Sequence, residues 1–109
     1  EKETRESKMQ KGYQSATLVP LKTVEDCRNA LQICFDISEI MDDGMASDVG
    51  SGALMANAGA ISAAYNVRIN IKSIKDKKFS NNTEKKLTEL LSDCEELLEK
   101  ISKNVERCL

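Results

Sequence analysis

Hydrophobic positions recur every three or four residues along most of this chain, which is the period of an α-helix. Runs of this kind predict four helices, separated by polar or helix-breaking residues. No segment alternates polar and apolar residues in the way that a half-buried strand does. The pattern therefore predicts an all-α fold, an antiparallel bundle of about four helices joined by short loops.

The first two predicted helices meet at the only proline of the chain. The first covers about residues 2–17, and Pro20 is expected to end it because a proline disfavours helical backbone at the residue before it. The second starts at Thr23, a good N-cap residue with Asp26 in the capping-box position. Gly44 suits the role of its C-terminal cap.

The third predicted helix runs from about Ser47 to Ile74, and the fourth follows the basic loop KDKKF at residues 75–79. Asn81 and Glu84 suit the cap of the fourth helix. This last helix has a wide apolar stripe that needs partner helices, formed by Leu87, Leu90, Leu91, Cys94, Leu97, Leu98, Ile101, Val105 and Cys108.

The third predicted helix is free of charge between Asp48 and Arg68 and consists mostly of Gly, Ala and Ser. Its transfer energy into lipid would be weak, so we do not expect it to span a membrane. Glycine inside a helix costs roughly 0.5–1 kcal/mol relative to alanine. Its glycines therefore indicate a close approach, either of a ligand or only of neighbouring helices along the line Gly52, Ala56, Ala60 and Ala64.

One stripe of this helix is small or polar from end to end. At about 100° per residue it contains Asp48, Gly52, Met55, Gly59, Ser62, Asn66, Asn70 and Ser73. Neutral Asn and Ser beside Gly indicate the wall of a partly dry cleft. Asp48 and Asn66 lie roughly 27 Å apart along a helix, so they serve separate tasks unless a symmetric dimer brings them together. Arg68 points away from Asn66 and suits a structural or intersubunit ion pair.

Composition limits the chemistry. The 109 residues suffice for one domain, residues 1–109, and the net charge of −2 with interleaved lysines argues against nucleic-acid binding. There is no histidine, so proton transfer would fall to carboxylates, lysines, Tyr13 or Tyr65.

The four cysteines include no CxxC pair. They are interpreted as core residues in a reducing compartment, the cytoplasm, with a metal or disulfide role as the alternative.

The segment SDVGSGALMANAGAISAAYNVRINIKSIKD (47–76), preceded by LVPLKT (18–23), resembles the cyclodeaminase/cyclohydrolase family of one-carbon folate metabolism. The resemblance covers residues 5–79 and fits the last helix by pattern only. It implies an all-helical homodimer with a folate cleft at or near the subunit interface. The N-terminal half typical of the family is absent from this sequence. The resemblance therefore implies the C-terminal portion of a cyclodeaminase-type domain, within a larger dimeric bundle.

The resemblance also implies the chemistry. Family enzymes close 5-formiminotetrahydrofolate to 5,10-methenyltetrahydrofolate with release of ammonia, which is the leading prediction, or hydrolyse the methenyl ring to 10-formyltetrahydrofolate. Asp48 is the predicted proton carrier, with capping of the helix beside Ser47 as its alternative role. Ser47, Gly52, Asn66 and Asn70 are the predicted substrate-binding residues. For the two asparagines the alternative is helix-to-helix hydrogen bonding.

The basic residues after the third helix have two interpretations. They attract the anionic glutamate tail of folate, or they form an ordinary solvated loop: Lys72, Lys75, Lys77 and Lys78. A tetrahydrofolate derivative is the expected substrate, with no bound cofactor and no metal. A non-catalytic helical dimerisation module is the alternative from another functional class.

Overall fold

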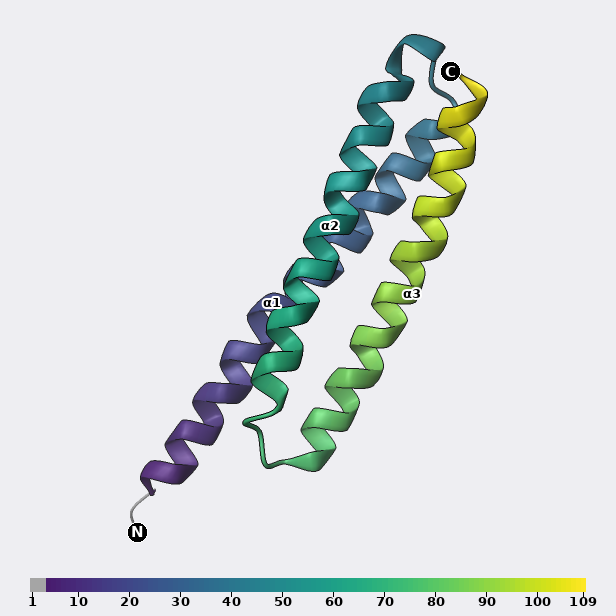
Figure 1. The fold of residues 1–109 in the computed structure, drawn as a ribbon. Helices are drawn as coiled ribbons and strands as arrows, with labels where there is room; N and C mark the ends of the chain where they lie inside the picture. Colours follow the sequence, from purple (N-terminus) through teal and green to yellow (C-terminus); the bar gives the residue numbers. More distant parts are fainter. Residues whose placement is uncertain (1–3) are drawn as a thin grey trace.

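The computed structural model describes residues 4–109, which form three long helices (Figure 1). These are α1 (Arg5–Ser38), α2 (Ala46–Ile71) and α3 (Lys77–Arg107), and a short 3₁₀ helix, η1 (Asp43–Met45), precedes α2. The molecule is elongated, with extents of 65 × 18 × 18 Å. The predicted all-α class is confirmed, but within residues 4–109 the long helices number three and not four. No helix in this part of the chain is long and apolar enough to cross a membrane.

The difference in helix number arises at Pro20, which lies inside α1 and does not end it. A proline in a helix removes one hydrogen bond and crowds the carbonyl four residues earlier, here that of Ala16. Thr17 and Val24, on either side of the proline, are completely buried in the core. Burial of this segment against the other helices outweighs the local preference for a break, and the predicted end of a first helix near Thr17 is wrong.

The caps differ from the predicted ones for the same reason. Thr23 is not an N-cap, since its hydroxyl donates to the carbonyl of Val19 inside α1 at 3.3 Å. The N-cap of α1 is Thr4, whose hydroxyl accepts from Ser7 N at 3.0 Å. The predicted start at Lys2 lies outside the described residues. Gly44 lies in η1, well past the end of α1, and does not cap it.

The bounds of the other helices are closer to the prediction. Helix α2 begins one residue before Ser47 and ends three residues before Ile74. Helix α3 begins earlier than expected, because Asp76 Oδ1 accepts from Phe79 N at 3.1 Å and caps it. Part of the predicted basic loop is therefore the first turn of α3, and the predicted cap at Asn81 is wrong.

The three helices share one core. Its largest fully buried side chains are Leu31, Leu87, Ile101, Val24, Val67, Thr17 and Cys94. The apolar stripe of α3 faces it as predicted, and α2 contributes Ala53, Ala60 and Ala64. Because these α2 side chains are small, the helix lies close to both neighbours.

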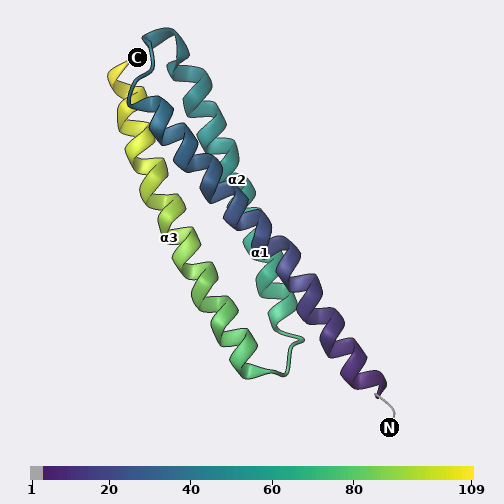
Figure 2. The same ribbon diagram turned by 180° about the vertical axis from the view of Figure 1, so that it is seen from behind.

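The two ends of the bundle are held by different polar contacts. At the end where the chain terminates, Asn104 is buried and its Nδ2 donates to Ser38 Oγ and to Glu39 Oε2, both at 2.8 Å. At the other end, Gln10 contacts the connection between α2 and α3. Figures 1 and 2 show that the C-terminus lies beside the α1–α2 connection, whereas the N-terminal part of α1 extends past the α2–α3 connection.

Candidate functional site

A groove with a volume of about 640 Å³ runs between α1 and α2. From α2 it is lined by Gly59, Ser62, Ala63, Asn66 and Asn70, and from α1 by Ala16, Val19, Pro20 and Thr23. The lining combines neutral amide and hydroxyl groups with apolar surface and contains no charged side chain. The polar stripe predicted on α2 thus forms one wall of an open cleft, but only along its C-terminal half.

The two asparagines of this wall differ in their contacts. Asn66 is exposed and its side chain has no hydrogen-bond partner within residues 4–109. Asn70 is half-buried, and its Nδ2 donates to the carbonyl oxygen of Ala16 at 3.2 Å. The alternative of helix-to-helix hydrogen bonding therefore applies to Asn70, while Asn66 presents a free carboxamide to the groove.

The acceptor of the Asn70 bond follows from Pro20. In a regular helix the N–H of residue 20 would donate to the carbonyl of residue 16, and proline has no N–H. Asn70 supplies the missing donor from the neighbouring helix. The hydroxyl groups of Thr17 and Thr23 donate to the carbonyls of Tyr13, at 2.8 Å, and of Val19, at 3.3 Å.

The other predicted site residues lie elsewhere. Ser47, Asp48 and Gly52 are exposed in the first turns of α2 and do not line the groove. Asp48 and Asn66 share one continuous helix, so they are separated by roughly 27 Å along its axis. Helix α2 has Met45 as its N-cap residue, with no side-chain cap hydrogen bond, and Asp48 makes no contact of this kind. The capping alternative for Asp48 and Ser47 is therefore wrong, and the side chain of Asp48 is free within the described residues.

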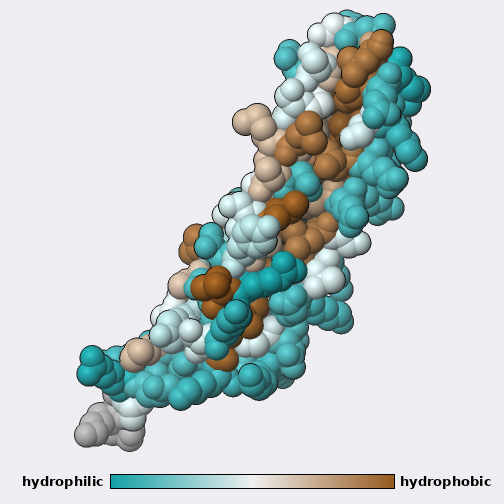
Figure 3. Space-filling model, in the orientation of Figure 1, coloured by the Kyte–Doolittle hydropathy of each residue, from teal (hydrophilic) through white to brown (hydrophobic). Residues whose placement is uncertain are grey.

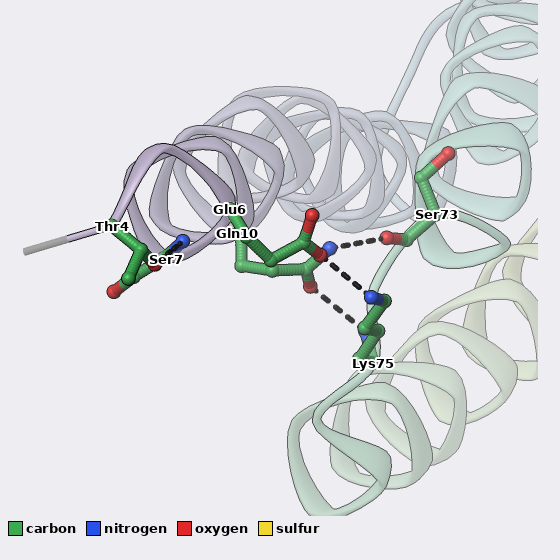
Figure 4. Close-up of polar contacts among 6 residues, drawn as sticks. All are labelled: Thr4, Glu6, Ser7, Gln10, Ser73 and Lys75. Carbon is green, nitrogen blue, oxygen red and sulfur yellow. Dashed lines mark hydrogen bonds and ion pairs between the residues drawn. The ribbon is translucent and has the colours of Figure 1, made fainter.

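A second hollow, of about 520 Å³, opens where α1 meets the end of α2, near Asn70. Gln10 closes one side of it through two hydrogen bonds (Figure 4). Its Nε2 donates to the carbonyl of Ser73 at 2.9 Å, and its Oε1 accepts from Lys75 N at 2.8 Å. The ammonium of Lys75 lies 2.7 Å from Glu6 Oε2. No spacing signal in the sequence marks Gln10 or Glu6, because the contact depends on how α1 crosses α2.

The basic residues of this hollow are not equivalent. Lys75 is paired with Glu6, whereas Lys72 and Lys77 line the hollow, and neither has an ion-pair partner within residues 4–109. Tyr13 lines the same hollow. Arg68 lies 3.8 Å from Glu84 of α3 and so forms an ion pair within the chain, as one of its two predicted roles requires.

Cys94 lies in the core and Cys27 and Cys34 pack against it, whereas Cys108, predicted as a core residue, lies just past the end of α3 and outside the core cluster. All four thiols are free, and Cys94 is completely buried. Burial raises the pKa of Cys94 to about 11, and the nearby Cys27 thiol adds to the effect. Burial also raises the pKa of Cys27. Protonated thiols are poor nucleophiles and poor metal ligands, and residues 4–109 contain no group of three side chains able to hold a metal ion. The core interpretation fits Cys94 and Cys27.

Comparison with known proteins identifies the family. The family model for formiminotransferase-cyclodeaminase matches residues 1–106. The chain belongs to the formiminotransferase-cyclodeaminase family. It is 35% identical over 105 residues to the methenyltetrahydrofolate cyclohydrolase of Methylorubrum extorquens, covering 96% of this chain and 50% of that protein. It is 31% identical over 96 residues to the formimidoyltransferase-cyclodeaminase of Gallus gallus, covering 88% of this chain and 18% of that protein.

The chain thus spans about half the length of the first of these relatives. The family match also covers α3 as far as residue 106, whereas the resemblance seen in the sequence fitted this helix by its apolar pattern only. In this family member the two segments that carry the resemblance, Val-Pro-Leu and Asn-Val-Arg-Ile-Asn, face each other across the groove. Asn70 of the second segment also bonds the carbonyl of Ala16, three residues before Val19.

Proposed function

We propose that this chain supplies part of the substrate site of a one-carbon folate enzyme, and that the groove between α1 and α2 holds the folate ring system. The observation that carries the proposal is the uncharged lining of the groove, with the free amide of Asn66 beside Ser62 and the apolar Val19 and Pro20. Such a lining suits a planar, neutral heterocycle with hydrogen-bonding edges. Family membership and the name of the methenyltetrahydrofolate cyclohydrolase relative support the same substrate class.

The second hollow suits the other end of the molecule. Lys72 and Lys77 stand at the same end of the bundle as Asn70 and have no ion-pair partner within residues 4–109. We propose that a folate seated in the groove directs its anionic glutamate tail towards these two lysines. Lys75 contributes less, because Glu6 already neutralises it.

The proposed reaction is ring closure of 5-formiminotetrahydrofolate to the 5,10-methenyl form with loss of ammonia. Hydrolysis of the methenyl ring to 10-formyltetrahydrofolate is supported equally, since the two relatives carry names of both kinds. Both reactions pass through a tetrahedral carbon between two nitrogens and need a proton carrier. Asp48 has the free carboxylate for this role, but it lies too far from Asn66 to act on the same molecule from one subunit.

A homodimer would resolve this separation, and we include it in the proposal. Large apolar side chains of α2 remain between 43% and 73% exposed, namely Leu54, Met55, Ile61, Tyr65 and Ile69. Figure 3 shows hydrophobic side chains along much of the length of the molecule, between polar flanks. Large exposed apolar side chains that gather on one helix are typical of an interaction surface. Packing of α2 against a second copy would cover them and bring two α2 helices together.

The cytoplasm, where thiols stay reduced, is the proposed location of the protein.

Binding is the first test, because it does not require the complete catalytic apparatus. We expect 5-formyltetrahydrofolate, a stable analogue, to bind in calorimetry, and Asn66→Ala to weaken the binding about tenfold by removing a hydrogen-bonding group. Asn82→Ala, an exposed asparagine of α3, is the matched control and should leave binding unchanged. Equal effects of the two substitutions would contradict the assignment of the groove.

Activity then separates the functional alternatives. Incubation with 5-formiminotetrahydrofolate should yield the ultraviolet band of the methenyl product together with ammonia. Consumption of methenyltetrahydrofolate faster than in buffer, without the first reaction, would identify a cyclohydrolase. A dimer that binds no folate analogue and shows neither reaction would favour the non-catalytic dimerisation module.

A further inference from the structure

Asn70 makes a contact that separates it from Asn66, although both lie on the same wall of the groove. The carbonyl of Ala16 can only accept, so the carboxamide of Asn70 has one usable orientation, with Nδ2 towards Ala16. This bond replaces the one that Pro20 cannot make, and both Ala16 and Pro20 line the groove. Asn70 is therefore part of the link between the two walls.

The neighbouring contacts show why this link matters. Thr17 and Leu21 of this stretch of α1 are buried, whereas Ala16 and Val19, which line the groove, are exposed. Core packing therefore holds the buried side of this stretch, while its groove side is joined to α2 by the Asn70 bond. Within residues 4–109, the Asn70 bond is the hydrogen bond that joins α1 and α2 in the groove itself.

We propose that Asn70 is a positioning residue of the groove. Its side chain substitutes for the N–H that Pro20 lacks, holds the α1 wall against α2, and thereby sets the width of the cleft in which Asn66 contacts the ligand. The ligand part of this inference rests on the proposed function, whereas the coupling between Asn70 and Pro20 does not.

The test is a double-mutant cycle with Pro20→Ala, which restores an N–H at residue 20 that can bond the Ala16 carbonyl. Asn70→Ala alone should reduce both the folding equilibrium constant and the affinity for 5-formyltetrahydrofolate by about fivefold, the usual effect of one hydrogen bond. In the Pro20→Ala background the same substitution should change either quantity less than twofold. Urea unfolding and calorimetry measure the two cycles independently.

Asn70→Asp distinguishes positioning from direct ligand contact without altering the proline. Aspartate keeps the shape and the acceptor oxygen but loses the donor, so the proposal requires it to weaken binding at least as much as Asn70→Ala does. Binding retained by Asn70→Asp, or an Asn70→Ala effect equally large in both backgrounds, would overturn the positioning role. Unfolding coupling without any folate binding by the unaltered chain would support the link to Pro20 and contradict the proposed function instead.

Discussion

A methyl group placed on Gly59 would lie 3.1 Å from the sulfur of Cys27. This is closer than an ordinary van der Waals contact, so α1 and α2 approach each other here because residue 59 has no side chain. Gly59 also lines the groove, beside Ser62 and Asn66. Of the glycines on the polar stripe, Gly59 is therefore explained by a neighbouring helix, whereas Gly52 has nothing within 4 Å of the corresponding position.

This difference predicts opposite effects of the same substitution at two glycines of α2. Gly52→Ala should stabilise the protein by roughly 0.5–1 kcal/mol, because alanine has the higher helix propensity and finds open space. Gly59→Ala should destabilise it by about 1 kcal/mol, since overpacking costs roughly 1–3 kcal/mol and exceeds the gain in propensity. Urea unfolding of both variants measures the free energies of unfolding.

The double variant Gly59→Ala with Cys27→Ala is the control for this prediction. Removing the sulfur opens the space that the new methyl group needs, so the two substitutions should be less destabilising together than their sum. Stabilisation of the protein by Gly59→Ala alone would contradict the close approach.

The buried amide of Asn104 yields a second prediction. Its Nδ2 donates to Ser38 and Glu39, and its Oδ1 accepts from Arg107 Nη1 at 2.6 Å. Asn104→Ala should cost about 2 kcal/mol of unfolding free energy, because it removes three hydrogen bonds of a buried side chain, two of them to charged groups. Asn82→Ala, on the exposed face of the same helix, should change the stability by less than about 0.5 kcal/mol. Thermal and urea unfolding compare the two, and similar values would exclude a stabilising network.

The buried thiol of Cys94 predicts a loss of stability at alkaline pH. Burial raises its pKa from 9.0 to about 11, so the folded protein holds the thiol proton more tightly than the unfolded chain does. The resulting stabilisation is complete below pH 9 and is lost as the pH rises through about 11. Cys94→Ala should therefore flatten the fall in unfolding free energy between these two pH values, and an unchanged slope would show that other groups cause it.

The sequence predicted the features that depend on periodicity and missed those that depend on crossing helices. The apolar stripe of α3 and the bounds of α2 follow from spacing along one helix. The groove wall from Gly59 to Asn70 follows from helical phase. Phase alone could not show that the groove ends at Gly59 and does not reach Gly52. The continuity of α1 through Pro20 was missed, because it depends on burial of Thr17 and on a donor 50 residues away in sequence, at Asn70.

The distance between Asp48 and Asn66 yields the last prediction, which concerns the proposed dimer. If each active site takes Asp48 from one copy and Asn66 from the other, Asp48→Asn should abolish activity in a homodimer. Asn66→Ala should reduce it about tenfold at substrate concentrations below the KM, in line with its weaker binding. Mixing the two variants under conditions that exchange subunits should restore about a quarter of the original activity, because half of the dimers are mixed and each has one intact site. Light scattering on either variant alone should still report a dimer. Subunit exchange without any recovery of activity would show that Asp48 and Asn66 do not meet across an interface, and the catalytic role of Asp48 would lose its structural basis.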